Sequence, residues 1–96
     1  MGANKMPEIR FGDNTGWIWN SWLDVVQFTA EVGGSRVICR VSRKCLEDHC
    51  GDPKAPGEYL DAAKKNTEAI THKVQLLIQS GRYELDGSIL VRATDW

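Results

Sequence analysis

The stretch VVQFTAEVGGSRVICRV, residues 25–41, decides the fold of this chain. Apolar and polar residues alternate along two runs, residues 25–32 and 36–41, which is typical of strands with one buried face. Gly33 and Gly34 lie between the runs and tolerate the positive φ that a tight turn requires. These residues therefore predict an antiparallel hairpin with Cys39 on its apolar face.

Two helical segments follow this hairpin. Ser42 is a suitable N-cap for a short helix, which we expect to end at Gly51. A long helix is predicted over residues 58–80, because apolar residues recur there at steps of three and four. Asn66 lies at the centre of this apolar stripe. We expect its amide to be buried and hydrogen-bonded to a backbone group of the short helix or of a hairpin, and the alternative is that it lines a pocket.

The two ends of the chain complete the predicted domain. RYELDGSILVRATDW, residues 82–96, indicates a strand, a type I′ turn at Asp86-Gly87 and a second strand. Residues 9–11 indicate a short strand, and residues 1–8 a disordered tail. The prediction is a single α+β domain over residues 9–96, in the order ββ(β)-α-α-ββ. It is a two-layer sandwich with helices on one face of an antiparallel or mixed sheet of two hairpins.

Composition narrows the functional classes. Twelve Lys and Arg residues against thirteen Asp and Glu residues give a net charge of −1, whereas a dedicated nucleic-acid binder usually has a basic excess. The sequence contains no apolar run that could cross a bilayer, and its first residues lack the apolar core of a signal peptide. We therefore expect a cytoplasmic protein whose three cysteines are reduced.

Three segments together resemble a known family. They are VQFTAEVGGSRVICRVSRKCLEDHCG in the hairpin and short helix, AAKKNTEAI in the long helix, and ELDGSILVRATDW at the end. This succession is similar to the small bacterial family called domain of unknown function 1488, over about residues 9–96. The resemblance implies the same α+β fold, and it implies no assigned activity.

CLEDHCG, residues 45–51, is the strongest candidate for chemistry. Cys45, His49 and Cys50 lie within six positions, which raises the hypothesis of a thiol or metal site. On a helix, however, Cys45 and Cys50 point in directions about 140° apart. The alternative interpretation places Leu46 and Cys50 in the core, and Glu47, Asp48 and His49 in water.

Aromatic and basic residues form the other candidate site, an interaction surface. Its members are three tryptophans and three arginines: Trp17, Trp19, Trp22, Arg36, Arg40 and Arg43. Exposed aromatic side chains suit a protein partner, and a basic sheet face with aromatic neighbours suits single-stranded nucleic acid. The alternative interpretation is that two of the tryptophans close the core and that the arginines are only solvated.

The sequence contains no nucleotide-binding loop, nucleophile elbow or zinc-protease motif. We therefore expect a non-enzymatic module without a cofactor or a metal. It would act through a protein partner or through self-association as a homodimer, with weak nucleic-acid binding as one alternative. The thiol or metal site at Cys45, His49 and Cys50 is the other.

Overall fold

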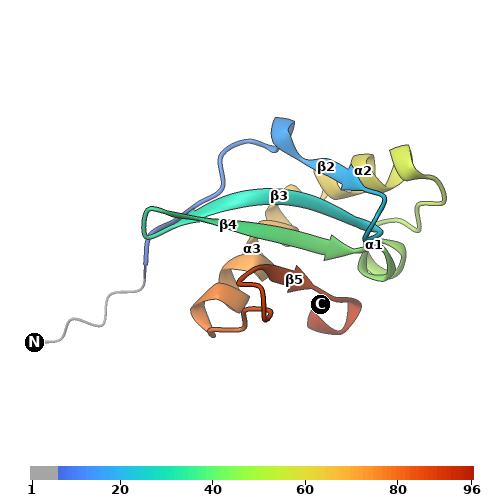
Figure 1. Ribbon diagram of the computed structural model, residues 1–96. Coiled ribbons are helices and arrows are strands. Elements are labelled where there is room, and N and C mark those ends of the chain that lie inside the picture. Colours follow the sequence, from blue (N-terminus) through green and yellow to red (C-terminus); the bar gives the residue numbers. More distant parts are fainter. Residues whose placement is uncertain (1–6) are drawn as a thin grey trace, which may run out of the picture.

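A computed structural model describes residues 7–96, and Figure 1 shows their arrangement around one mixed sheet. Strands β3 (Val25–Val32) and β4 (Ser35–Ser42) form the centre of this sheet. Two short strands, β1 (Ile9–Arg10) and β2 (Ile18–Asn20), pair antiparallel with successive parts of β3. The fifth strand, β5 (Ile89–Val91), runs parallel to β4 at the opposite edge.

The predicted central hairpin is confirmed. β3 and β4 pair antiparallel along their whole length, from Val25 opposite Ser42 to Val32 opposite Ser35. The turn residues Gly33 and Gly34 have φ of 58° and 88°, a conformation that L side chains rarely adopt. The turn residues and the alternation along the strands therefore both specify this hairpin.

The predicted short helix is also confirmed, as α1 (Arg43–His49). The Ser42 hydroxyl accepts a hydrogen bond of 3.1 Å from the amide of Cys45, as an N-cap should. Gly51 follows the helix with a φ of 88°.

The predicted long helix is wrong as a single element. It is divided into α2 (Pro56–Lys65) and α3 (Thr67–Gln79), and Asn66 between them has the non-helical angles φ −113° and ψ 27°. The Asn66 amide is half-buried, and it donates a 2.8 Å hydrogen bond to the carbonyl of Ala62 within α2. The predicted bond to the short helix or a hairpin is therefore wrong too. An Asn side chain that competes for backbone groups favours such a helix end, and the apolar spacing continues across it unchanged.

The predicted C-terminal hairpin is wrong as well. A tight loop does form, because the amide of Glu84 donates to the carbonyl of Ser88 at 2.8 Å. The loop contains three residues, 85–87, and of these only Gly87 has a positive φ, so it is not a type I′ turn. Residues 82–84 form no strand, and β5 pairs with β4 instead. The Asp-Gly pair predicted a turn correctly but carried no information about the strand that β5 would join.

The core lies between the sheet and the helices. In Figure 1, α2 and α3 lie behind the sheet and α1 lies at the end where β4 stops. The core residues come from alternate positions of the strands and from the inner sides of the helices. They are Trp17, Val26, Phe28, Ala30, Cys39, Val41, Cys45, Leu46, Cys50, Tyr59, Ala63, Ile70, Val74, Ile78, Ile89 and Val91.

Two further predictions concern the ends of the chain and the membrane. Most of the predicted disordered tail, residues 1–6, lies outside the described residues, and within the rest the carbonyl of Glu8 accepts a 2.9 Å hydrogen bond from Gly33. Within residues 7–96, no helix combines the length and the apolar character that a bilayer crossing requires.

Candidate interaction surface

The sheet face opposite α2 and α3, here called the open face, carries an unusual share of exposed apolar side chains. The strand register places Ile18, Gln27, Arg40 and Leu90 in one row across this face. Ile38 is in the next row, opposite Thr29. Ile18 is 52% exposed and Ile38 is 38% exposed. A solvated sheet face is usually polar, so these residues make the open face the candidate interaction surface.

A polar network runs through the centre of the open face. The Gln27 side-chain oxygen accepts hydrogen bonds from Asn20 Nδ2 and from Arg40 Nε, both at 3.1 Å. Arg40 also donates through one terminal nitrogen to the Ser88 hydroxyl at 3.1 Å and to the Asp86 carboxylate at 3.3 Å. The network thus joins β2, β3 and β4 to the loop before β5. These hydrogen bonds fix the position of the Arg40 guanidinium, and Asp86 pairs with its charge.

Asp86 supplies the counter-charge for Arg40. Its carboxylate accepts hydrogen bonds from the Ser88 hydroxyl at 2.6 Å and from the Ser88 amide at 2.9 Å. These two bonds, followed by the contact with Arg40, lower the pKa of Asp86 from its usual 3.8 to about 2. The carboxylate is therefore ionised throughout the neutral range, and the centre of the open face has no net charge.

A hollow of about 430 Å³ lies beside this network. Leu23, Val25, Leu85 and Leu90 form its apolar walls. The polar groups are the Arg40 guanidinium, the Ser88 hydroxyl and the carboxylates of Glu84 and Asp86. Leu23 is 53% exposed and the Leu85 side chain is completely exposed. An apolar hollow with a few polar groups is the usual form of a binding site.

The turn between β2 and β3 carries Trp22, which precedes Leu23 of this hollow in the sequence. Asn20 accepts hydrogen bonds through its side-chain oxygen from the amides of Trp22, at 3.0 Å, and Leu23, at 3.3 Å. Asp24 completes the turn with a φ of 53°, and its carbonyl accepts from the amide of Arg43. Trp22 is 95% exposed on this well-anchored turn. Exposed tryptophan side chains are enriched in protein interfaces, so Trp22 belongs to the candidate surface.

The other two tryptophans of the predicted surface lie elsewhere. Trp17 is 4% exposed and stacks on Phe28 in the core, with ring centroids 4.1 Å apart. Trp19 is half-buried and stacks on Tyr59 of α2 at 4.9 Å. The three tryptophans therefore do not form one exposed patch, and only Trp22 is presented to solvent.

The three arginines are also separated. Arg36 and Arg40 share the open face, and Arg36 is directly opposite Glu31 in the register. Arg43 lies on α1, donates to Glu47 at 2.9 Å and packs over the Tyr59 ring at 5.4 Å. Arg40 and Arg43 are paired with carboxylates and the three arginines are dispersed, so this arrangement gives the nucleic-acid alternative little support.

Arg43, Glu47 and Tyr59 form a cluster whose polar groups bind one another. The Tyr59 hydroxyl donates to Glu47, which raises the pKa of Tyr59, and the same bond followed by that from Arg43 lowers the pKa of Glu47. Trp19 covers Tyr59, so the cluster ties α1, α2 and β2 together. Its groups satisfy one another, which is the pattern of a structural contact.

The structure does not bring Cys45, His49 and Cys50 together as a ligand set. Cys45 and Cys50 are buried in the core cluster, with Leu46 between them. His49 is exposed and contacts the end of the chain, where its Nε2 lies 3.0 Å from the carbonyl oxygen of Ala93 and its ring stacks on Trp96. Cys50 and Leu46 occupy the core as the alternative interpretation predicted, and Cys45 joins them. Among residues 7–96, no group of three or more His, Cys, Asp or Glu side chains is placed to hold a metal ion.

The thiols are also electronically unsuited to act as nucleophiles. Burial raises the pKa of both Cys39 and Cys45 from 9.0 to about 12, and it raises the pKa of Cys50 as well. A thiolate, the reactive form, is therefore scarce at neutral pH. These three cysteines behave as small apolar core residues.

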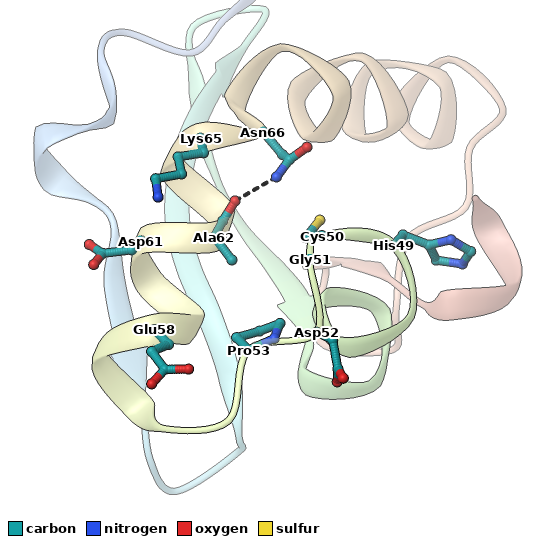
Figure 2. Close-up of a pocket in the computed structure, with 10 residues that line it drawn as sticks. All are labelled: His49, Cys50, Gly51, Asp52, Pro53, Glu58, Asp61, Ala62, Lys65 and Asn66. Carbon is teal, nitrogen blue, oxygen red and sulfur yellow. Dashed lines mark hydrogen bonds between the residues drawn. The ribbon is translucent and has the colours of Figure 1, made fainter.

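A second hollow lies between the end of α1 and α2, and Figure 2 shows the residues around it. The carboxylates of Asp52, Glu58 and Asp61 point in different directions, and the His49 ring is turned away from the others. The Asn66 amide is engaged with Ala62. Groups that diverge in this way cannot act together on one substrate atom, so the open face is the better candidate site.

Most of the open-face site was not predicted from the sequence. No site role was predicted for Gln27, Leu23, Leu85, Leu90 or Asp86. Leu23 and Leu85 did carry a signal, because each is an apolar residue next to turn formers, where a solvated loop would be polar.

The comparisons with known proteins agree with the resemblance in the sequence. The family model DUF1488, described as a protein of unknown function, matches residues 9–91. The chain belongs to the DUF1488 family. None of the curated proteins matches this DUF1488 chain.

A solved structure shows the same fold. It is the crystal structure of a protein of unknown function from the DUF1488 family of Shewanella loihica PV-4. It is 23% identical to this chain, with a TM-score of 0.78 over 94% of this chain and 96% of that one. The overall fold is therefore shared by two DUF1488 chains of divergent sequence.

Proposed function

We propose that this DUF1488 protein acts through protein–protein contact at the open face of its sheet, and that it catalyses no reaction. The observation that carries this proposal is the distribution of exposed apolar residues. Large apolar side chains that are exposed number seven within residues 7–96. Four of them, Ile18, Leu23, Ile38 and Leu85, lie on the open face or line its hollow, and Trp22 is adjacent to Leu23.

The electrostatics of the open face favour a protein over a charged ligand. Arg40 is held by Gln27, Ser88 and Asp86, and Glu84 forms an ion pair of 2.9 Å with Arg92. An anionic ligand would have to displace Asp86 from Arg40. An apolar side chain of a partner would cover Leu23, Leu85 and Leu90 without breaking any of these bonds, which is how the centre of a protein interface gains affinity.

The size of the face is compatible with this role. A standard interface removes about 800 Å² per partner from water. The whole chain exposes 6024 Å², so such an interface would occupy about an eighth of its surface. One face of a five-stranded sheet in a small domain offers an area of this order.

A comparison of immobilised variants tests the proposal. Wild type, Leu85→Glu and Leu76→Glu are used to capture proteins from a lysate and untagged copies of the chain itself. Leu76 is a matched control because it is also exposed, at 44%, but lies on α3 in the helix layer. We expect wild type and Leu76→Glu to retain the same partners and Leu85→Glu to lose them. Identical retention by all three variants would contradict the proposal.

A further inference from the structure

The open face has a hollow, and the turn that supplies one of its walls also carries an exposed aromatic side chain. Trp22 is 95% exposed, and the next residue, Leu23, forms one wall of the hollow. Trp22 itself is not among the residues that line the hollow. The hollow and the exposed indole are therefore supplied by adjacent residues of one turn, and the indole does not fill the hollow.

The hollow suits an indole in size and in shape. Its volume of about 430 Å³ is near the lower end of the range of roughly 300–1,000 Å³ for ligand pockets. Leu23, Leu85 and Leu90 give it apolar walls, against which an aromatic ring can bury a large area. A tryptophan is also the residue type that most often anchors a protein interface.

The polar groups of the hollow suit an indole as well. An indole has one N–H donor and no acceptor, so a buried tryptophan needs an acceptor nearby. The hollow supplies the carboxylates of Glu84 and Asp86 and the hydroxyl of Ser88. Its one cation, Arg40, already donates to three other side chains. A neutral apolar group with a single donor therefore matches this site better than an anion does.

A protruding side chain and a matching hollow on the same surface are what a twofold-symmetric dimer requires, because each copy must supply both halves of the contact. The near-neutral charge of the chain, −1, does not oppose the approach of a second copy. We propose that two copies of this chain associate through their open faces, and that Trp22 of each copy occupies the hollow formed by Leu23, Leu85 and Leu90 of the other. This inference rests on the proposed function and names its partner.

Single substitutions test the two halves of the contact separately. Trp22→Ala removes the protruding side chain, and Leu85→Glu adds a charge to the wall of the hollow, while Leu76→Glu on α3 serves as the control. Sedimentation equilibrium measures the dimer dissociation constant over a range of concentrations. We expect each of the first two variants to weaken the dimer by at least about thirtyfold, the effect of losing an interface hot spot. We expect Leu76→Glu to leave it unchanged.

A mixing experiment tests the pairing itself. The Trp22→Ala chain keeps the hollow, and the Leu85→Glu chain keeps the indole, so a mixture can form one of the two contacts. We expect a heterodimer at concentrations where neither variant dimerises alone. Urea denaturation of each variant shows that it is folded, and unchanged midpoints are expected because both residues are exposed.

Four outcomes would overturn the inference. They are a wild-type chain that stays monomeric, a dimer that survives Trp22→Ala, an equal loss in Leu76→Glu, and single variants that are monomeric but fail to complement each other. The proposed function would still stand after any of these outcomes if immobilised wild type captures a protein other than this chain and immobilised Leu85→Glu does not. If all three immobilised variants retain the same proteins, the proposed function fails as well.

Discussion

One face of the sheet is packed against α2 and α3, and within residues 7–96 no helix lies over the other, although the same strands supply both. On β3, Val26, Phe28 and Ala30 point toward the helices and are at most 4% exposed. Gln27 and Thr29 lie between them and belong to the open face. The covered face is held by close apolar packing, whereas the open face is held by hydrogen bonds around Arg40 and leaves Ile18 and Ile38 partly in water. The covered face therefore accounts for the core of the fold, and the exposed apolar side chains of the open face are the basis for proposing it as the binding surface.

The largest expected effect comes from removing matched side chains on the two sides of the sheet. Ile70 of α3 is completely buried, and Ile38 of β4 is 38% exposed on the open face. We expect Ile70→Ala to lower the free energy of unfolding by about 2–5 kcal/mol, because it leaves a cavity. We expect Ile38→Ala to lower it by less than about 1 kcal/mol, because little packing is lost. Equal losses in urea denaturation would show that the open face is also a packed core.

The three cysteines test the packed side of the same comparison, because all of them belong to the core cluster. The rise in pKa from 9.0 to about 12 for Cys39 and Cys45 lowers the thiolate fraction at neutral pH by about a thousandfold. We therefore expect the native chain to resist alkylation at these residues at pH 7.5 and to react at all three once it is unfolded in urea. Mass spectrometry after timed alkylation measures this. A cysteine of the native chain that reacts as fast as a free thiol would contradict the assignment of all three to the core.

A smaller effect on stability is expected from substituting two arginines. Arg40 lies at the centre of the open face, whereas Arg43 lies on α1. The Arg40 side chain is 20% exposed and donates to three groups, whereas the Arg43 side chain is 52% exposed and pairs with Glu47. We expect Arg40→Met to lower the free energy of unfolding by about 1–2 kcal/mol, because its charged hydrogen bonds are lost. Arg43→Met is expected to cost about 0.5 kcal/mol, as for an exposed i,i+4 pair. An equal cost for both would mean that the network does not stabilise the open face.

The comparison also explains how much of the molecule could be predicted from its sequence. The β3–β4 hairpin and the Ser42 cap depend on neighbours in the chain, so alternation, Gly33-Gly34 and cap chemistry were sufficient. The break at Asn66 was missed because the apolar spacing runs across it and keeps Ile70 and Ala63 on the buried side.

The pairing of β5 with β4 and the site on the open face could not be predicted for a related reason. Both depend on contacts between residues far apart in the sequence, such as Arg40 with Asp86 and Ser88. The Asp-Gly signal fixed a turn, but the choice of strand partner is made by the whole sheet. Trp17, Trp19 and Trp22 have the same residue type within six positions, and only their packing separates two structural residues from an exposed one.

The smallest expected effect is a pH dependence of the free energy of unfolding, which the Asp86 carboxylate on the open face causes. Its pKa is about 2 in the folded chain and 3.8 ordinarily, so folding favours the ionised form. The stability it contributes is therefore complete above about pH 4 and is lost as the pH falls toward 2. We expect Asp86→Asn to be less stable than wild type at pH 6, and the difference between the two chains to shrink over this acidic window. Because the carboxylate is more than half exposed, solvent screens its contact with Arg40 and keeps the effect small. Urea denaturation of both chains at a series of pH values measures the difference, and a constant difference from pH 6 to pH 2 would show that the Asp86 charge does not support the open face.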